Sequence, residues 1–74
     1  MANRHYIPKL KVRVHVEMTD GAQLGGHFFV PANSRVLDMM NDPSYFIPFL
    51  RDDGYVVMLN KFEISRMIPY DQKS

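Results

Sequence analysis

Residues 10–18 read Leu-Lys-Val-Arg-Val-His-Val-Glu-Met, and this stretch decides the fold. Apolar and polar residues alternate without exception, so every second side chain is apolar. Successive side chains of a β-strand point to opposite faces, and an unbroken alternation indicates a strand with one buried face and one wet face. The sequence therefore predicts an antiparallel strand over residues 9–18.

The turn after this strand follows from which residues would face each other. Directly opposed residues in a sheet share a face. A two-residue loop would place Arg13 opposite Phe28, whereas a three-residue loop over 19–21 places Val12 opposite Phe28. Only the second arrangement keeps the apolar residues of both strands together, because a slip of one residue turns an apolar face to water. We therefore expect a type I turn with a bulge, in which Gly21 has a positive φ.

The rest of the chain divides into short elements separated by turn residues. Asp52-Asp53-Gly54 repeats the chemistry of the first turn, and residues 60–63 form a single tight turn before the last strand. Pro48 predicts an edge position or a bulge for the third strand, because proline donates no ladder hydrogen bond. The expected strands span residues 9–18, 22–30, 45–51, 55–60 and 64–68.

One short helix is expected over residues 35–41, between the second and third strands. Asn33 or Ser34 can cap its first turn, because short polar side chains accept a hydrogen bond from the free N–H groups there. A helix this short depends on packing for its stability. The residues expected to face the sheet are Val36, Leu37 and Met40.

Three polar residues of this helix have two possible roles. Arg35 and Asp38 are three apart and can pair across one turn, and Asn41 can supply the C-cap. The structural interpretation is that they hold the helix in place. The alternative is a polar clamp for a small ligand, built from Arg35 and Asp38.

Two stretches carry a resemblance to known domains. The first hairpin and the segment 56–64, Val-Val-Met-Leu-Asn-Lys-Phe-Glu-Ile, resemble the first two and last two strands of Sm-like proteins. The chain also resembles a group of small uncharacterised bacterial domains that share three short motifs. These are Arg-x-x-Asp-x-x-Asn at Arg35, Asp38 and Asn41, a Phe-Ile pair at Phe46 and Ile47, and Asn-Lys-x-x-Ile at Asn60, Lys61 and Ile64. The resemblance implies a mainly β fold, a small five-stranded SH3-like or Sm-like barrel with one short helix between strands two and three. It implies no activity.

Length and composition narrow the class of protein. The chain has 74 residues, no cysteine and a net charge of +1, and we expect one domain over 1–74 with an ordered core of about 9–70. A chain of this size buries only about 60% of its unfolded surface, and without disulfides or thiolate zinc sites oligomerisation is the common remaining stabiliser. The first ten residues are polar, and no apolar run approaches the roughly 18 residues of a membrane span. We therefore expect a soluble cytoplasmic protein with no membrane partner.

The strongest functional signal is a surplus of large apolar residues. If Phe46, Pro48 and Leu50 face the core, the alternating residues of the same strand face outward. The segment 55–59 is apolar on both faces, as expected for a strand covered by the core on one side and by the helix or a neighbouring subunit on the other. A contiguous exposed apolar patch marks an interface. The predicted interface residues are Phe29, Tyr45, Ile47 and Phe49.

A basic face is the basis of a second hypothesis. Lys11, Arg13, His15 and His27 are expected on the wet face of the first hairpin with Phe29 among them, a mixture that suits single-stranded nucleic acid. The two histidines would be diagonal neighbours. A cation opposite His27 and the lack of a third ligand other than Glu17 argue against a metal site.

The sequence thus favours a non-catalytic interaction or assembly module that binds itself or another protein. Sm-like RNA binding is the first alternative, and a small-ligand sensor is the second. No enzyme is expected, because no nucleophile accompanies a histidine and an acid in a known motif and no phosphate-binding loop is present. No cofactor and no metal are expected.

Overall fold

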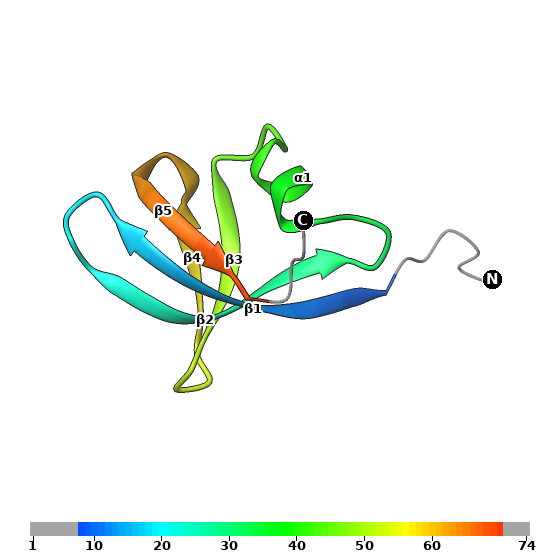
Figure 1. Ribbon diagram of the computed structural model, residues 1–74, viewed down its shortest axis with the longest axis horizontal. Coiled ribbons are helices and arrows are strands. Elements are labelled where there is room, and N and C mark those ends of the chain that lie inside the picture. Colours follow the sequence, from blue (N-terminus) through cyan, green and yellow to red (C-terminus); the bar gives the residue numbers. More distant parts are fainter. Residues whose placement is uncertain (1–7, 71–74) are drawn as a thin grey trace.

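The described part of the molecule is one antiparallel sheet with one short helix. The computed structural model describes residues 8–70, so the ends of the expected domain lie outside the described residues (Figure 1). The elements, in chain order, are β1 (Lys9–Met18), β2 (Gln23–Pro31), α1 (Val36–Met40), β3 (Phe46–Arg51), β4 (Val56–Asn60), η1 (a 3-10 turn, Lys61–Glu63) and β5 (Ile64–Pro69).

The first hairpin has the register that the alternation predicts. Val12 lies opposite Phe28, and Val14 lies opposite Gly26. All four residues are buried, and the polar residues of β1 between them are more exposed. The apolar sets of the two strands therefore share the inner face, which confirms the three-residue loop.

Both hairpin turns have the same geometry. Gly21 has a φ of 91° and Gly54 a φ of 94°, both in the region that side chains with a Cβ rarely adopt. In the first turn the Gly21 N–H donates to Met18 O at 2.9 Å, and in the second the Gly54 N–H donates to Arg51 O at 2.9 Å. The positive φ predicted at Gly21 is confirmed.

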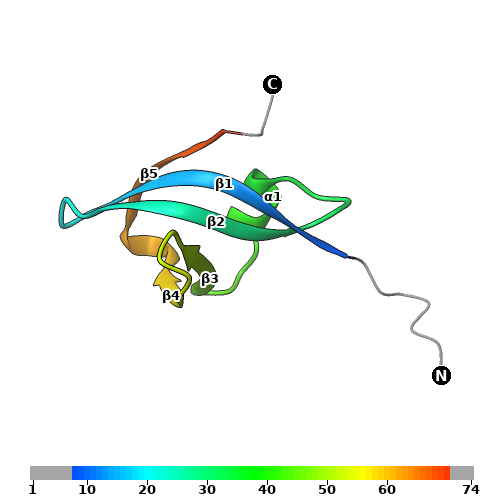
Figure 2. The same cartoon turned by 90° about the horizontal axis from the view of Figure 1, so that it is seen from below.

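The five strands form an open sheet in the order β4-β3-β2-β1-β5. Figure 2 shows how the sheet bends, with the long β1–β2 ribbon lying over β3 and β4. No ladder joins β4 to β5 within residues 8–70, so these two strands are the edges. The mainly β class, the five antiparallel strands and the short helix agree with the sequence prediction, but the sheet is not closed into a barrel.

The core lies inside the bend. Phe28 and Phe49 meet edge to face, with ring centroids 5.4 Å apart. Gly26 makes room for this pair, because a Cβ there would lie 2.2 Å from Leu50 O and 2.7 Å from the Phe49 ring. The buried apolar residues are Val12, Val14, Val16, Phe28, Val30, Val36, Ile47, Phe49 and Leu59.

The predicted orientation of β3 is wrong. Ile47 is 4% exposed and Phe49 is fully buried, whereas Phe46 is 53% exposed. The reason is the pairing with β2. Phe49 lies opposite Phe28, whose side chain points inward, and opposed residues share a face. Ile47 and Phe49 are therefore core residues, and Pro48 and Leu50 of the same strand point outward with Phe46.

The helix differs from its prediction in its cap and in one packing residue. Its N-cap is Arg35 rather than Asn33 or Ser34. Val36 is buried and Met40 packs on the core, but Leu37 is 65% exposed. Five helical residues present only one face to the sheet, and Leu37 lies beside that face rather than on it. Within residues 8–70, no helix has the length and apolar character needed to span a bilayer.

Candidate docking surfaces on the sheet

The outer face of β3 and β4 is mostly apolar, with Asn60 opposite Phe46 as its polar member. Pro48 lies opposite Met58, and Leu50 lies opposite Val56. Phe46, Val56 and Met58 are 53–57% exposed, because Ile47 and Phe49 take the inner positions of β3. No charged residue interrupts this surface. We call it the outer patch, and it consists of Phe46, Pro48, Leu50, Val56 and Met58.

A second exposed apolar feature is an aromatic pair that flanks β3 and β4 in the chain. The rings of Tyr45 and Phe62 meet edge to face with centroids 5.2 Å apart, and each residue is 65% exposed. Lys61 lies 5.9 Å from the Phe62 ring centroid, and its Nζ donates to the carbonyl oxygen of Asp42. The exposure predicted for Tyr45 is confirmed, and its ring packs against another exposed ring, that of Phe62.

The free edge of β4 borders the outer patch. The Arg51 N–H donates to Tyr55 O at 2.8 Å, and the Lys61 N–H donates to Tyr45 O at 2.7 Å. Odd-numbered residues of β4 therefore direct their backbone groups toward β3, and Val56 and Met58 direct theirs away from it. No strand among residues 8–70 pairs on that side. β4 also lacks the lysine, proline or bulge that commonly protects an edge strand.

The opposite edge, β5, is protected. Its ladder with β1 shifts register next to Glu17, and the strand ends in Pro69. Arg66 Nε lies 3.3 Å from Glu17 Oε1 and keeps a charged group on this strand. A bulge, a proline and a charge are the features that discourage edge pairing. The two edges of the sheet are thus chemically different.

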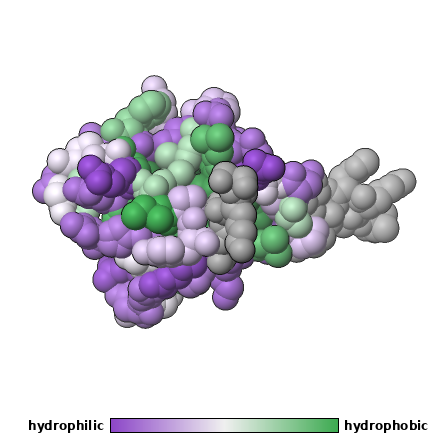
Figure 3. Space-filling model, viewed as in Figure 1, coloured by the Kyte–Doolittle hydropathy of each residue, from purple (hydrophilic) through white to green (hydrophobic). Residues whose placement is uncertain are grey.

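Figure 3 shows the face that carries β5 and α1. Hydrophobic atoms reach the surface in its centre, and its periphery is mostly hydrophilic. Leu37 and Ile68 are 65% and 49% exposed. These residues come from separate elements, and single exposed apolar residues are ordinary on a protein surface.

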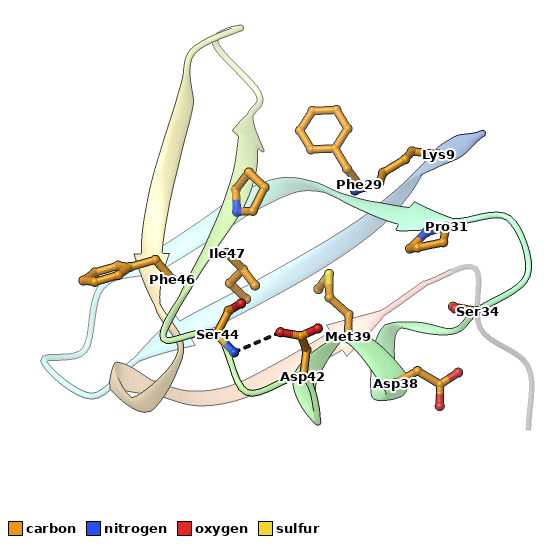
Figure 4. A pocket seen from close by; sticks show the side chains of 11 residues that line it. Lys9, Phe29, Pro31, Ser34, Asp38, Met39, Asp42, Ser44, Phe46 and Ile47 are labelled. Atoms are coloured by element: carbon orange, nitrogen blue, oxygen red, sulfur yellow. Dashed lines mark hydrogen bonds between the residues drawn. The ribbon is translucent and has the colours of Figure 1, made fainter. Parts of the chain in front are cut away.

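A groove opens where β3 leaves β2 (Figure 4). The ladder between these strands ends at Phe28 and Phe49, because the next pair would need an N–H from Pro48. The prediction that Pro48 lies on an edge strand is wrong, because β3 lies between β2 and β4. The ladder between β2 and β3 nevertheless ends at the position where Pro48 would have to donate an N–H. The groove has a volume of about 280 Å³, and α1 lies beside it.

The groove brings together three of the predicted residues, Phe29, Asp38 and Ile47. Figure 4 shows Met39 reaching from α1 toward the strands and Phe29 projecting away from the helix. Lys9 also lines the groove. The walls are therefore mixed, with apolar side chains next to charges of both signs.

The carboxylates of the groove bind their own backbone. Asp42 accepts a hydrogen bond from the Ser44 N–H at 2.9 Å, which, with the nearby charge of Lys61, lowers the pKa of Asp42. Asp38 accepts a hydrogen bond from the Arg35 N–H at 3.0 Å. The Arg35 side chain does not line the groove, so the two residues form a helix cap rather than a clamp. Asn41 is the C-cap, as predicted.

The basic residues of the first hairpin share a face as predicted, but their charge is reduced. Arg13 lies opposite His27, and its guanidinium makes a two-point ion pair with Asp52, with Nη2 and Oδ2 3.2 Å apart. This hydrogen bonding raises the pKa of Arg13 and lowers that of Asp52. His15 Nε2 lies 3.0 Å from Gln23 Oε1. Lys11, opposite Phe29, is exposed.

Sequence reasoning missed both Asp52 and the correct members of the apolar surface. Asp52 is 39 residues from Arg13, and nothing local signals their contact. The lack of a polar face in segment 55–59 did indicate that β4 has a second apolar face. The sequence could not show which of its side chains point outward. Within residues 8–70, no group of three or more His, Asp or Glu side chains is placed to hold a metal ion.

Comparison with protein-family models, with curated proteins and with solved structures finds no significant match.

Proposed function

We propose that this chain is a small non-catalytic assembly module that binds a protein surface through the outer patch and the free edge of β4. We also propose that its bent, open sheet is an incomplete SH3-like or Sm-like barrel. The single sheet bent over one core supports this classification.

The observation that carries the assembly function is the outer patch. Three of its side chains are more than half exposed although the chain has a well-formed core. Burying one Val, Phe or Met side chain stabilises by about 1.5–3 kcal/mol. A small domain has a total stability of only about 5 kcal/mol, so covering two or three of these side chains is a large gain.

RNA binding is less well supported than protein binding. Asp52 pairs with Arg13 in the middle of the basic face, and its carboxylate also lies near His27. A ligand clamp is less well supported for a similar reason, because Asp38 is used in capping α1.

The test measures mass and melting temperature against protein concentration. We expect the wild-type chain to form a discrete oligomer whose melting temperature rises with concentration, because association stabilises only the folded state. Met58→Lys should give a smaller particle. Leu37→Lys is the matched control, since Leu37 is also more than half exposed but lies outside the outer patch.

Two outcomes would contradict the assembly function. The assembly function would lose its support if the wild-type chain were monomeric at millimolar concentration and bound no protein from its native lysate. A salt-dependent shift of single-stranded RNA in a gel, abolished by Lys11→Ala, would favour the nucleic-acid alternative instead.

A further inference from the structure

We propose that Met58 is a reversible oxidation site, at which a peroxide converts the thioether to a sulfoxide and weakens binding at the outer patch. The site follows from the exposure of Met58, which is 57% in the single chain. The effect on binding rests on the assembly function.

The sulfur of this chain is confined to methionine. The chain has six methionines, no cysteine and no tryptophan, so thioethers are the side-chain groups that mild peroxide oxidises most readily. A response to mild peroxide therefore runs through a methionine and leads to a sulfoxide.

Exposure distinguishes Met58 from the other methionines of residues 8–70. Met58 is more than half exposed, whereas the others are partly buried and pack against the core. A thioether reacts by direct contact with peroxide in solution, so the side chain with more of its surface in water reacts faster. The shielded residues are Met18, Met39, Met40 and Met67.

Met58 has only apolar neighbours on β3. It lies opposite Pro48, and Phe46 and Leu50 are its diagonal neighbours on the same face. None of these three side chains can donate a hydrogen bond. A sulfoxide oxygen that a partner covers here would receive no hydrogen bond from the β3 side chains, and a buried polar group without a hydrogen bond opposes binding.

The reaction transfers one oxygen atom and two electrons. A lone pair of the Met58 sulfur attacks one oxygen of hydrogen peroxide, the O–O bond breaks and an S–O bond forms. The other oxygen leaves as hydroxide and takes up the proton of the transferred oxygen to become water, so the sulfur is oxidised and the peroxide is reduced. Methionine sulfoxide reductases, one for each sulfoxide epimer, reverse the reaction with a dithiol as reductant and release the oxygen as water.

Oxidation and binding at the outer patch oppose each other. A partner that covers the patch keeps peroxide from the Met58 sulfur, and a sulfoxide in the patch disfavours the partner. We therefore expect the rate of Met58 oxidation to fall as the protein concentration rises and the chain associates.

Peptide mass spectrometry tests the site, because trypsin cuts after Lys and Arg and leaves Met58 as the one methionine of the peptide 52–61. The shielded methionines fall in the peptides 14–35, 36–51 and 67–73. In dilute hydrogen peroxide and at low protein concentration, we expect the peptide 52–61 to gain an oxygen several-fold faster than these three. In urea, where the chain is unfolded, the rates should become similar. A folded chain in which Met58 reacts no faster than Met18 or Met67 would overturn the site and leave the assembly function intact.

Light scattering before and after oxidation measures the effect on binding. We expect oxidation to raise the dissociation constant of the wild-type oligomer about tenfold, and treatment with both sulfoxide reductases and dithiothreitol to restore it. Met58→Leu should show the same association with and without peroxide. Met67→Leu is the matched control and should respond to peroxide as the wild type does, since Met67 packs against the core.

Two outcomes would overturn the effect on binding. One is an oxidised wild-type chain that associates as tightly as the reduced chain. The other is a Met58→Leu variant that still loses association in peroxide, because another methionine would then be responsible. A chain that oxidises first at Met58 but never associates would contradict the assembly function and the effect on binding together, and would leave the oxidation site standing.

Discussion

Single residues decide where the strands of this sheet turn, pack closely and stop pairing. Gly26 lets the Phe49 ring pack against the β2 backbone, and Pro48 ends the ladder between β2 and β3. Gly21 and Gly54 supply the positive φ of the two turns. The three glycines act because they lack a Cβ, and Pro48 acts because it lacks an N–H. The turns and the core depend on the glycines, and the groove depends on the proline.

Replacing Gly26 should therefore destabilise the fold more than replacing its neighbour. A Cβ at Gly26 would meet backbone and a buried ring, and overpacking of this kind costs about 1–3 kcal/mol. A Cβ at Gly25 would meet Asp52 Oδ2 at 2.9 Å, the end of an exposed side chain that can move. Urea unfolding of Gly26→Ala and Gly25→Ala measures the difference. Equal losses would show that the close approach to Phe49 is not the cause.

The ion pair between Arg13 and Asp52 should make stability depend on pH in the acid range. The hydrogen bond from Arg13 lowers the folded-state pKa of Asp52 below the unfolded value of about 3.9. A depressed pKa contributes stability that is present above about pH 3.9 and is lost as the pH falls through the folded-state pKa. NMR titration should place the Asp52 midpoint below 3.9. In Arg13→Gln the midpoint should rise, and an unchanged midpoint would show that Arg13 is not the cause.

At the scale of elements, the orientation of β3 determines what the molecule presents to a partner. Pairing with β2 turns Phe49 inward, and Phe46 then points outward with the rest of the outer patch. The same strand thus supplies the core on one face and a candidate interface on the other. Substitutions on each face can measure the contributions of the two faces separately.

Phe49→Ala should lower the free energy of unfolding by about 3–5 kcal/mol, the usual cost of removing a buried aromatic ring. Phe46→Ala should change the stability of the monomer by less than about 0.5 kcal/mol, since the ring is 53% exposed, but should weaken association. Chemical denaturation at low concentration and mass at high concentration separate the two effects. A large loss of monomer stability in Phe46→Ala would contradict the assigned faces.

For the whole molecule, the decisive feature is that its two edges differ. β5 is protected by a bulge and a charge, and β4 is not. A domain with one unprotected edge and an apolar face beside it can associate in a defined way, because only one of its edges favours pairing.

Hydrogen exchange should report this edge directly. In dilute solution the amides of Val56 and Met58 should exchange fast, and those of Val57 and Leu59, which face β3, should exchange slowly. Raising the concentration should slow exchange at Val56 and Met58 if copies pair through β4. Slow exchange at both residues in a dilute monomer would contradict the open edge.

The sequence alone determined the elements and the geometry of the first hairpin. The alternation in 10–18 and the glycine at 21 are local signals, and a register follows from them because only one pairing keeps the apolar residues on one face. The strand and helix bounds also agree with the prediction to within about a residue at each end.

The tertiary structure alone decided which residues reach the surface. Phe46, Ile47, Phe49 and Leu50 are all apolar, so alternation within β3 cannot tell its two faces apart. The pairing of Phe49 with Phe28 across the ladder determines which face of β3 points inward. Contacts between distant parts of the chain also bring Asp52 to Arg13 and leave β4 at an edge of the sheet. Local patterns specify elements that differ in their two faces, whereas an element that is apolar on both takes its orientation from its neighbours.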